Sequence, residues 1–138
     1  MTVGHTEIRN IMRLTLVVDG SRTQVEQVVK QLYKIIEVRK VSDVTDDPRV
    51  ERELALIKVT SKSTTRGEIM QLADIFRARI VDVAMGSLTV EVTGPSEKID
   101  SMVQLLRGYG IKEMVRTGVV AMVRGAQLRD VTQEEKSA

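Results

Sequence analysis

The 138-residue chain carries 21 basic residues against 19 acidic ones, and 42% of its residues are hydrophobic. This length allows one ordinary hydrophobic core or two small packed units, and it excludes more than two domains. The nearly balanced charge produces a weak outer field, which argues against a nucleic-acid or membrane partner.

Strand and helix patterns alternate along the first 47 residues. A run rich in Leu and Val predicts a strand over residues 12–18, closed by an Asp-Gly turn. A second strand is predicted over residues 38–44. The turn formers before Pro48 place a boundary between residues 47 and 48. Between the two strands, apolar residues at three-and-four spacing predict a helix whose buried face comprises Val25, Val28, Val29, Leu32 and Ile36.

Residues 48–126 contain a fuller set of elements, and the polar residues 127–138 predict a frayed tail. Thr65 and Glu68 have the spacing of a capping box at the start of one helix. A second helix begins at Pro95-Ser96 and ends at Gly108 and Gly110. Strands are predicted over residues 54–60, 80–84, 87–93, 111–115 and 119–123. The residues expected on the buried face of the first helix are Ile69, Leu72, Ala73 and Phe76, and those on the buried face of the second are Ile99, Met102, Val103 and Leu106.

An internal repeat with an offset of 74 residues aligns residues 14–32 with residues 88–106. Chance similarity between two amphipathic strand–helix pairs is the alternative interpretation, but the shared glycine favours a true repeat. Six positions are identical, namely Leu14/Leu88, Thr15/Thr89, Val18/Val92, Gly20/Gly94, Val29/Val103 and Leu32/Leu106.

The element order of the second unit is βαββαβ, which is the ferredoxin-like arrangement of one sheet covered by two helices. The first unit lacks the opening strand and helix, so the repeat implies roughly twenty or more residues upstream of Met1. We therefore predict an α+β protein of tandem ferredoxin-like units, the first incomplete. Because its strands 12–18 and 38–44 would lose their common neighbour, we expect this unit to be weakened or exchanged with another chain.

Candidate catalytic groups are scarce. The only histidine is His5, in a glycine-flanked leader, and no nucleophile or metal-ligand spacing accompanies it. Gly108-Tyr109-Gly110 resembles the start of a dinucleotide fingerprint, but the third glycine is missing and helix termination explains it better. The strands that would bind RNA contain no aromatic residue for base stacking. An enzyme acting alone and a nucleic-acid-binding protein are both disfavoured.

The absence of cysteine excludes disulfides and thiolate metal sites, and it fits a reducing compartment. Apolar runs fall short of the ~18 residues of a membrane span, and the N-terminus lacks the pattern of a secretion signal. We expect a soluble cytoplasmic protein, or one of the plastid stroma if its source is a photosynthetic eukaryote.

Several stretches resemble the small regulatory subunit of acetolactate synthase, also called acetohydroxyacid synthase. Together they follow the family's order over nearly the whole chain. They are residues 2–7 (TVGHTE), 13–20 (RLTLVVDG), 30–36 (KQLYKII), 50–59 (VERELALIKV), 74–83 (DIFRARIVDV), 88–94 (LTVEVTG), 111–118 (IKEMVRTG) and 119–125 (VVAMVRG).

The resemblance implies a partial N-terminal ACT domain over residues 1–47 and a C-terminal ACT-like domain over residues 48–126. It implies a regulatory subunit that activates the catalytic (large) subunit and confers feedback inhibition in branched-chain amino acid biosynthesis. The holoenzyme would be a thiamine-diphosphate-dependent transferase, with thiamine diphosphate, Mg and FAD on the catalytic subunit and no cofactor in this chain. Family members form homodimers or higher homo-oligomers, and the effector, typically valine, binds between paired ACT domains.

Two sets of residues are candidate sites, the first implied by the resemblance and the second by an arginine that stands before a glycine turn. The residues expected near the effector are Thr2, Val3, Gly4 and His5. The family's first strand, loop and helix are missing here, which puts effector binding in doubt. The alternative interpretation of these four residues is a disordered leader. Arg116, Thr117 and Gly118 are the candidate contact with the partner, since an arginine fork can bind a carboxylate; a turn or bulge that requires glycine is the alternative. A free-standing ACT-type amino-acid sensor remains the second hypothesis for the whole chain.

Overall fold

The computed structural model describes residues 1–125, and the tail predicted over residues 127–138 lies outside the described residues. Contacts group the chain into two units, one comprising Met1–Leu16 with Glu51–Val120, the other Val17–Val50 with the segment that starts at Ala121. This grouping differs from the predicted division in placing the first sixteen residues with the longer unit. The domain boundary between residues 47 and 48 stays a prediction.

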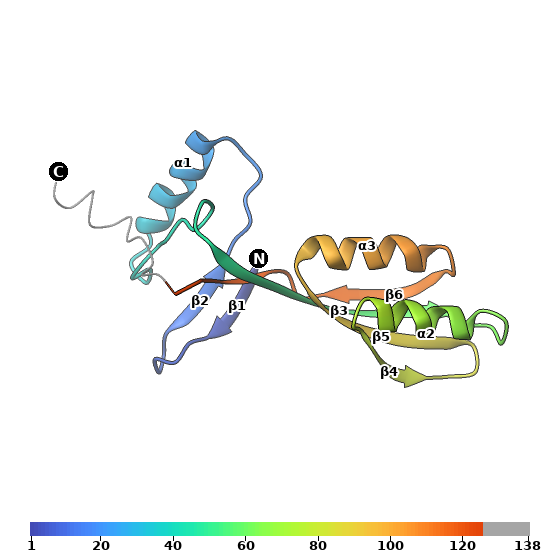
Figure 1. Ribbon diagram of the computed structural model, residues 1–138. Helices are drawn as coiled ribbons and strands as arrows, with labels where there is room; N and C mark the ends of the chain where they lie inside the picture. Colours follow the sequence, from blue (N-terminus) through green and yellow to red (C-terminus); the bar gives the residue numbers. More distant parts are fainter. Residues whose placement is uncertain (126–138) are drawn as a thin grey trace. The chain divides into compact units, whose positions relative to one another are not determined.

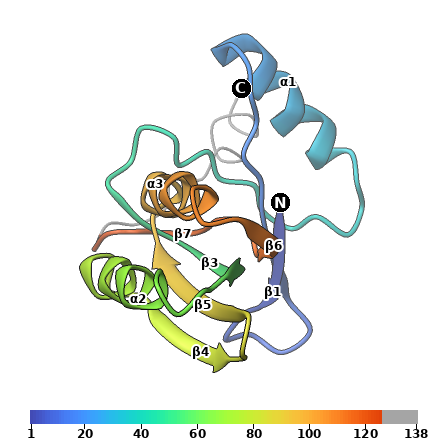
Figure 2. The same ribbon diagram turned by 90° about the vertical axis from the view of Figure 1, so that its right-hand side faces the viewer.

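The larger unit contains a sheet with two helices on one of its faces (Figure 1 and Figure 2). The strands lie in the order β4-β5-β3-β6 and pair antiparallel, so the predicted ferredoxin-like βαββαβ arrangement is confirmed. The elements are β3 (Arg49–Thr60), α2 (Arg66–Ile75), β4 (Arg79–Val83), β5 (Ser87–Gly94), α3 (Ser96–Arg107) and β6 (Ile111–Arg116).

The hydrophobic core lies between this sheet and its helices. Because side chains alternate across a strand, every second residue of β3 and β5 faces the helices and the residues between them face away. Leu72 and Phe76, both predicted to be buried, pack against the core and are only partly buried. The core side chains have at most 5% of their surface exposed, and they are Ala55, Ile57, Val59, Ile69, Ala73, Leu88, Val90, Val92, Ile99, Met102, Val103 and Leu106.

The helix ends follow the sequence signals in part. The predicted capping box of Thr65 and Glu68 is wrong, because the Thr65 hydroxyl bonds the backbone of Lys62 and makes no bond to its own helix.

The helix α3 does begin after Pro95, and Gly108 is its C-cap. Gly110 has φ +96°, where a side chain would be strained, and its carbonyl accepts from Thr60 N–H at 2.8 Å.

The N-terminal segment forms a separate two-stranded antiparallel sheet of β1 (Thr2–His5) and β2 (Met12–Thr15). Its register pairs Thr2 with Thr15 and His5 with Met12. The strand predicted over residues 12–18 is therefore found, but it ends three residues early. Both strands belong by contacts to the same unit as the larger sheet.

The second unit contains α1 (Arg22–Tyr33), which begins with a capping box that the sequence analysis did not identify. The strand predicted over residues 38–44 is wrong, because these residues pair with no strand. Instead, the Tyr33 hydroxyl donates to the carbonyl of Val41 at 2.9 Å and accepts from Val41 N–H at 2.8 Å. Ile36, predicted on the buried helical face, lies beyond the helix and is 96% exposed. The last strand, β7 (Val120–Val123), pairs with β3.

Candidate functional site

Groups for acid–base or metal chemistry do not converge in the part of the chain that the structure describes. His5 is exposed on β1. Within residues 1–125, His, Asp and Glu form no cluster that could hold a metal ion. None of the three helices in that range has both the length and the apolar content of a membrane span. Contact surfaces are therefore the features to examine.

The expected effector residues are the four residues of β1. Val3 is 59% exposed and Gly4 and His5 are also exposed, whereas Thr2 is half-buried. The Thr2 hydroxyl donates to the carbonyl of Val119 at 2.7 Å, although the two residues lie 117 positions apart. This bond ties the start of β1 to the turn that follows β6.

Arg116, at the end of β6, is held by two carboxylates. Its Nε and Nη2 donate to the two oxygens of Glu53 at 2.7 and 3.0 Å, and its Nη1 donates to Asp100 at 2.6 Å. The Ser96 hydroxyl also donates to Glu53 at 3.0 Å. Because β6 pairs Arg116 with Ala55, which is part of the core, the guanidinium lies on the side of the sheet that the helices cover. The Arg116 guanidinium, predicted to bind a carboxylate of a partner, thus binds two carboxylates of its own chain.

This cluster changes the ionisation of both groups. Glu53 is only 5% exposed, and burial alone would raise its pKa. The hydrogen bonds from Arg116 outweigh burial and hold the pKa of the Glu53 carboxyl below its ordinary value, with Ser96 acting in the same direction. The bonds to Glu53 correspondingly raise the pKa of Arg116. Both groups are therefore charged throughout the physiological range.

Thr117 and Gly118 complete the turn. Thr117 N–H donates to the Leu54 carbonyl at 3.0 Å, and the Thr117 hydroxyl accepts from Leu54 N–H at 3.1 Å. Gly118 has φ +84°, and a Cβ there would lie 3.1 Å from Cγ2 of Thr2 and 3.2 Å from the carbonyl oxygen of Met1. The structure therefore brings the two predicted site segments together, and glycine is required at their meeting point.

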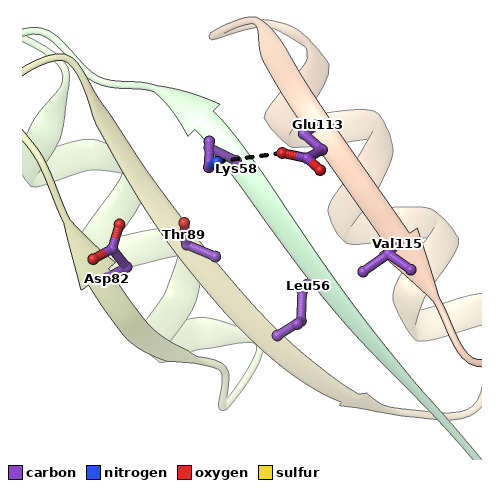
Figure 3. A pocket seen from close by; sticks show the side chains of 6 residues that line it. All are labelled: Leu56, Lys58, Asp82, Thr89, Glu113 and Val115. Carbon is purple, nitrogen blue, oxygen red and sulfur yellow. Dashed lines mark hydrogen bonds and ion pairs between the residues drawn. The ribbon is translucent and has the colours of Figure 1, made fainter.

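The face of the sheet opposite the helices carries a shallow pocket, seen from close by in Figure 3, and neither α2 nor α3 covers this face, which we call the uncovered face. The hollow has a volume of about 280 Å³. Lys58 pairs in register with Glu113 on one side and Thr89 on the other, and Leu56 pairs with Val115. Lys58 Nζ lies 3.2 Å from Glu113 Oε2. The lining residues are Leu56, Lys58, Asp82, Thr89, Glu113 and Val115.

This uncovered face, defined by those six lining residues, combines apolar and charged side chains. Leu56 is 36% exposed and Val115 is 59% exposed. Such a mixture is suited to contact with another polypeptide. Sequence reasoning did not single out these residues. The signal was the outward position of Leu54 and Leu56 on a strand whose odd-numbered residues already supply the core.

Comparison with known proteins places these features in one family. The family model described as "Small subunit of acetolactate synthase" matches residues 52–125, which contain nearly all of the βαββαβ unit. A probable acetolactate synthase small subunit of Archaeoglobus fulgidus is 54% identical over 125 residues, covering 91% of this chain and 78% of that protein. The acetolactate synthase small subunit of Bacillus subtilis is 51% identical over 128 residues, covering 92% and 74%.

A solved structure agrees with these matches. The crystal structure of the acetolactate synthase small subunit from Thermotoga maritima superposes with a TM-score of 0.83 at 41% sequence identity. The superposition covers 91% of this chain and 79% of that one. The similarity therefore extends beyond the ferredoxin-like unit to most of the described chain.

Proposed function

Because the chain belongs to the family of acetolactate synthase small subunits, the regulatory subunits of branched-chain amino acid biosynthesis, we propose that it binds and activates the catalytic subunit. The holoenzyme would be a thiamine-diphosphate-dependent transferase, with thiamine diphosphate, Mg and FAD held by the catalytic subunit. This chain would contribute contacts and no cofactor ligand. Regulation would follow from a difference in affinity between two states of the bound enzyme.

The uncovered face of the βαββαβ unit is the observation that carries this proposal. A sheet with helices on one side only leaves apolar side chains in water on the other, as Leu56 and Val115 show. Lys58 and Glu113, paired at 3.2 Å on the same face, add charges that select a partner by complementarity. The proposed contact with the catalytic subunit is therefore made through this face.

Feedback inhibition is proposed to act through β1. Three of its four residues are exposed, and within residues 1–125 the β1–β2 sheet has two strands, so each strand has an outer edge that no described strand pairs with. A second copy of the chain would pair at this edge in a homodimer or higher oligomer. A branched-chain amino acid, with valine as the first choice, would bind beside Thr2, Val3, Gly4 and His5.

The proposed partner role of Arg116, Thr117 and Gly118 takes an indirect form. Arg116 is 28% exposed, and three of its nitrogens donate to Glu53 and Asp100. Its contribution would be to fix the end of the sheet. Direct contact with the partner would be left to exposed atoms of Thr117.

The test is reconstitution with the catalytic subunit of the same organism. We expect co-elution on size exclusion and a rise in acetolactate formation when the chain is added. Val115→Arg should reduce both by placing a charge on the uncovered face. Met70→Arg is the matched control, because Met70 is 49% exposed on α2 and lies on the covered side of the sheet.

Three other outcomes would decide against parts of the proposal. Wild-type chain that neither co-elutes nor changes turnover would refute the regulatory role. Equal losses in Val115→Arg and Met70→Arg would refute the assignment of the uncovered face. A valine-dependent rise in melting temperature without any effect on the catalytic subunit would favour the free-standing sensor, because a ligand that binds only the folded state raises its stability.

A further inference from the structure

The turn after β6 is fixed by hydrogen bonds at Arg116, Thr117 and Val119. Arg116 binds Glu53 and Asp100, and Thr117 exchanges two bonds with the backbone of Leu54. The backbone of Gly118 adopts φ +84°. The Val119 carbonyl accepts the bond from the Thr2 hydroxyl. The turn therefore touches β1 at one end and helix α3, through Asp100, at the other.

The contact at the β1 end is unusually close. A Cβ at Gly118 would lie 3.1 Å from Cγ2 of Thr2 and 3.2 Å from the carbonyl oxygen of Met1, so a side chain there would displace these atoms by a few tenths of an ångström. At φ +84° an L side chain would also strain the backbone. A displacement of Thr2 is therefore felt at Gly118, and it reaches Arg116 through the intervening Thr117, whose two bonds to Leu54 lie next to Glu53.

We propose that Thr2, Gly118, Glu53, Arg116 and Asp100 form a coupling joint, in which Arg116 is the positioning residue that links the state of β1 to the first turns of α3. The proposal rests on the function proposed above, because it gives the route by which an effector beside β1 reaches the sheet that binds the catalytic subunit. It adds that the signal passes through the turn of residues 116–119.

In the proposed joint, the turn is the element with two arrangements that both sites bias, which coupling requires. In one arrangement the Thr2 hydroxyl bonds Val119, and Arg116 holds Glu53 and Asp100 together. In the other, Thr2 leaves the turn and the Gly118 backbone loses its packing. An effector that contacts β1 in only one arrangement shifts the population toward it.

The first measurement is hydrogen–deuterium exchange on the full chain alone. Gly118→Ala should displace Thr2, so we expect faster exchange in β1 and also in the first turns of α3, around Asp100. Gly67→Ala is the control, because a Cβ at Gly67 meets no atom within 4 Å. Faster exchange confined to residues near Gly118, with α3 unchanged, would overturn the joint.

The second measurement is inhibition of the reconstituted holoenzyme by valine, with Asp100→Asn as the variant. This change removes one charge from the joint at the end farthest from β1. We expect valine to bind the isolated variant with an affinity within about 2-fold of wild type, while its effect on turnover falls at least 5-fold, within the usual range of allosteric coupling. Glu97→Gln is the control, because it removes a similar charge from the same helix outside the joint.

The two proposals fail in distinguishable ways. Wild-type chain that leaves the catalytic subunit unchanged refutes the proposed function, and the exchange measurement then decides on the joint alone. A wild-type holoenzyme that valine inhibits, together with an Asp100→Asn holoenzyme inhibited to the same extent, refutes the joint and leaves the proposed function standing. A holoenzyme that is activated but insensitive to valine, leucine and isoleucine also refutes the joint as a route for feedback.

Discussion

The two copies of the internal repeat have the same helix lengths and opposite burial. α1 covers Arg22–Tyr33 and α3 covers Ser96–Arg107, so the helices begin and end at equivalent positions of the 74-residue offset. In the second copy Leu88, Val92 and Leu106 are at most 1% exposed. Their counterparts Leu14 and Val18 are 47% and 38% exposed, and no residue among the first fifty is buried.

The difference shows that an apolar sequence pattern determines which side of a helix or strand is apolar. Whether that side is buried depends on a neighbouring element that the pattern does not provide. In the second copy, β3 lies beside β5 in the centre of the sheet, and α2 packs on the same side as α3. In the first copy, β2 pairs only with β1, and residues 38–44 form no strand. Identical side chains therefore gain different amounts of burial energy.

The sharpest test of this contrast truncates the equivalent leucines. Leu106→Ala removes a fully buried side chain and should cost about 2–5 kcal/mol of unfolding free energy. Leu32→Ala removes a half-buried one and should cost about 1 kcal/mol or less. Urea denaturation followed by circular dichroism measures both. Equal costs would mean that α1 gains a full partner in solution, for example in a second copy of the chain.

A second test concerns the ion pair between Arg116 and Glu53 in the larger unit. Arg116→Met leaves the Glu53 carboxylate buried without its main partner, so we expect a loss of roughly 2–4 kcal/mol, moderated by the 28% exposure of Arg116. Adding Glu53→Gln to this variant should restore part of the loss. If Arg116→Met unfolds at the same urea concentration as wild type, the pair contributes nothing to stability.

The same pair predicts a dependence on pH. Because Arg116 lowers the pKa of Glu53 in the folded chain, the pair stabilises the fold above the ordinary carboxyl pKa of about 4.3 and loses this effect as pH falls through the lowered value. The stability difference between wild type and Glu53→Gln should therefore be largest near neutral pH and shrink under acid conditions. A difference that grows on acidification would contradict the assignment.

The second copy could be predicted from the sequence because its signals agree. The apolar positions of α3, the proline before it and Gly108 after it all indicate the same helix, and the structure has that helix. A strand was likewise predicted over residues 54–60, and in β3 the odd-numbered residues Ala55, Ile57 and Val59 are fully buried. Local pattern and tertiary packing give the same answer there.

The first copy and the site depended on information that the local pattern does not contain. Residues 38–44 have the composition of a strand but no neighbouring strand to pair with, so Tyr33 binds Val41 instead. Sequence reasoning predicted that Arg116 would bind a carboxylate of a partner. Its actual contact, Glu53, lies 63 residues away in the sequence, so no local pattern indicates it. The Thr2–Val119 bond, across 117 residues, was equally invisible.

Helix capping should matter more in the copy that lacks burial. α1 begins with a complete capping box, in which Ser21 Oγ accepts from Gln24 N–H and Gln24 Oε1 accepts from Ser21 N–H at 2.7 Å. The equivalent residue before α3 is Pro95, which makes no such bond. Ser21→Ala should therefore cost α1 about 1 kcal/mol, measured by hydrogen exchange of its amides. Thr65→Ala, where the hydroxyl makes no cap bond, should change α2 less, and the reverse order would contradict this account.

The smallest effect is expected at the glycine that both copies share. A Cβ at Gly20 would lie 2.5 Å from Gln24 Oε1, and one at Gly94 would lie 2.5 Å from Cδ of Lys98. Alanine reduces the freedom of the unfolded chain, which favours folding by about 0.4–1 kcal/mol where the site can accept it. Lys98 can turn away at the cost of one exposed bond, from its Nζ to the Thr93 carbonyl at 3.1 Å, so Gly94→Ala should be close to neutral. Gln24 cannot move without breaking the capping box of α1, so Gly20→Ala should lose the stabilisation that alanine gives through the unfolded chain. In thermal unfolding, Gly94→Ala should therefore have a higher midpoint than Gly20→Ala.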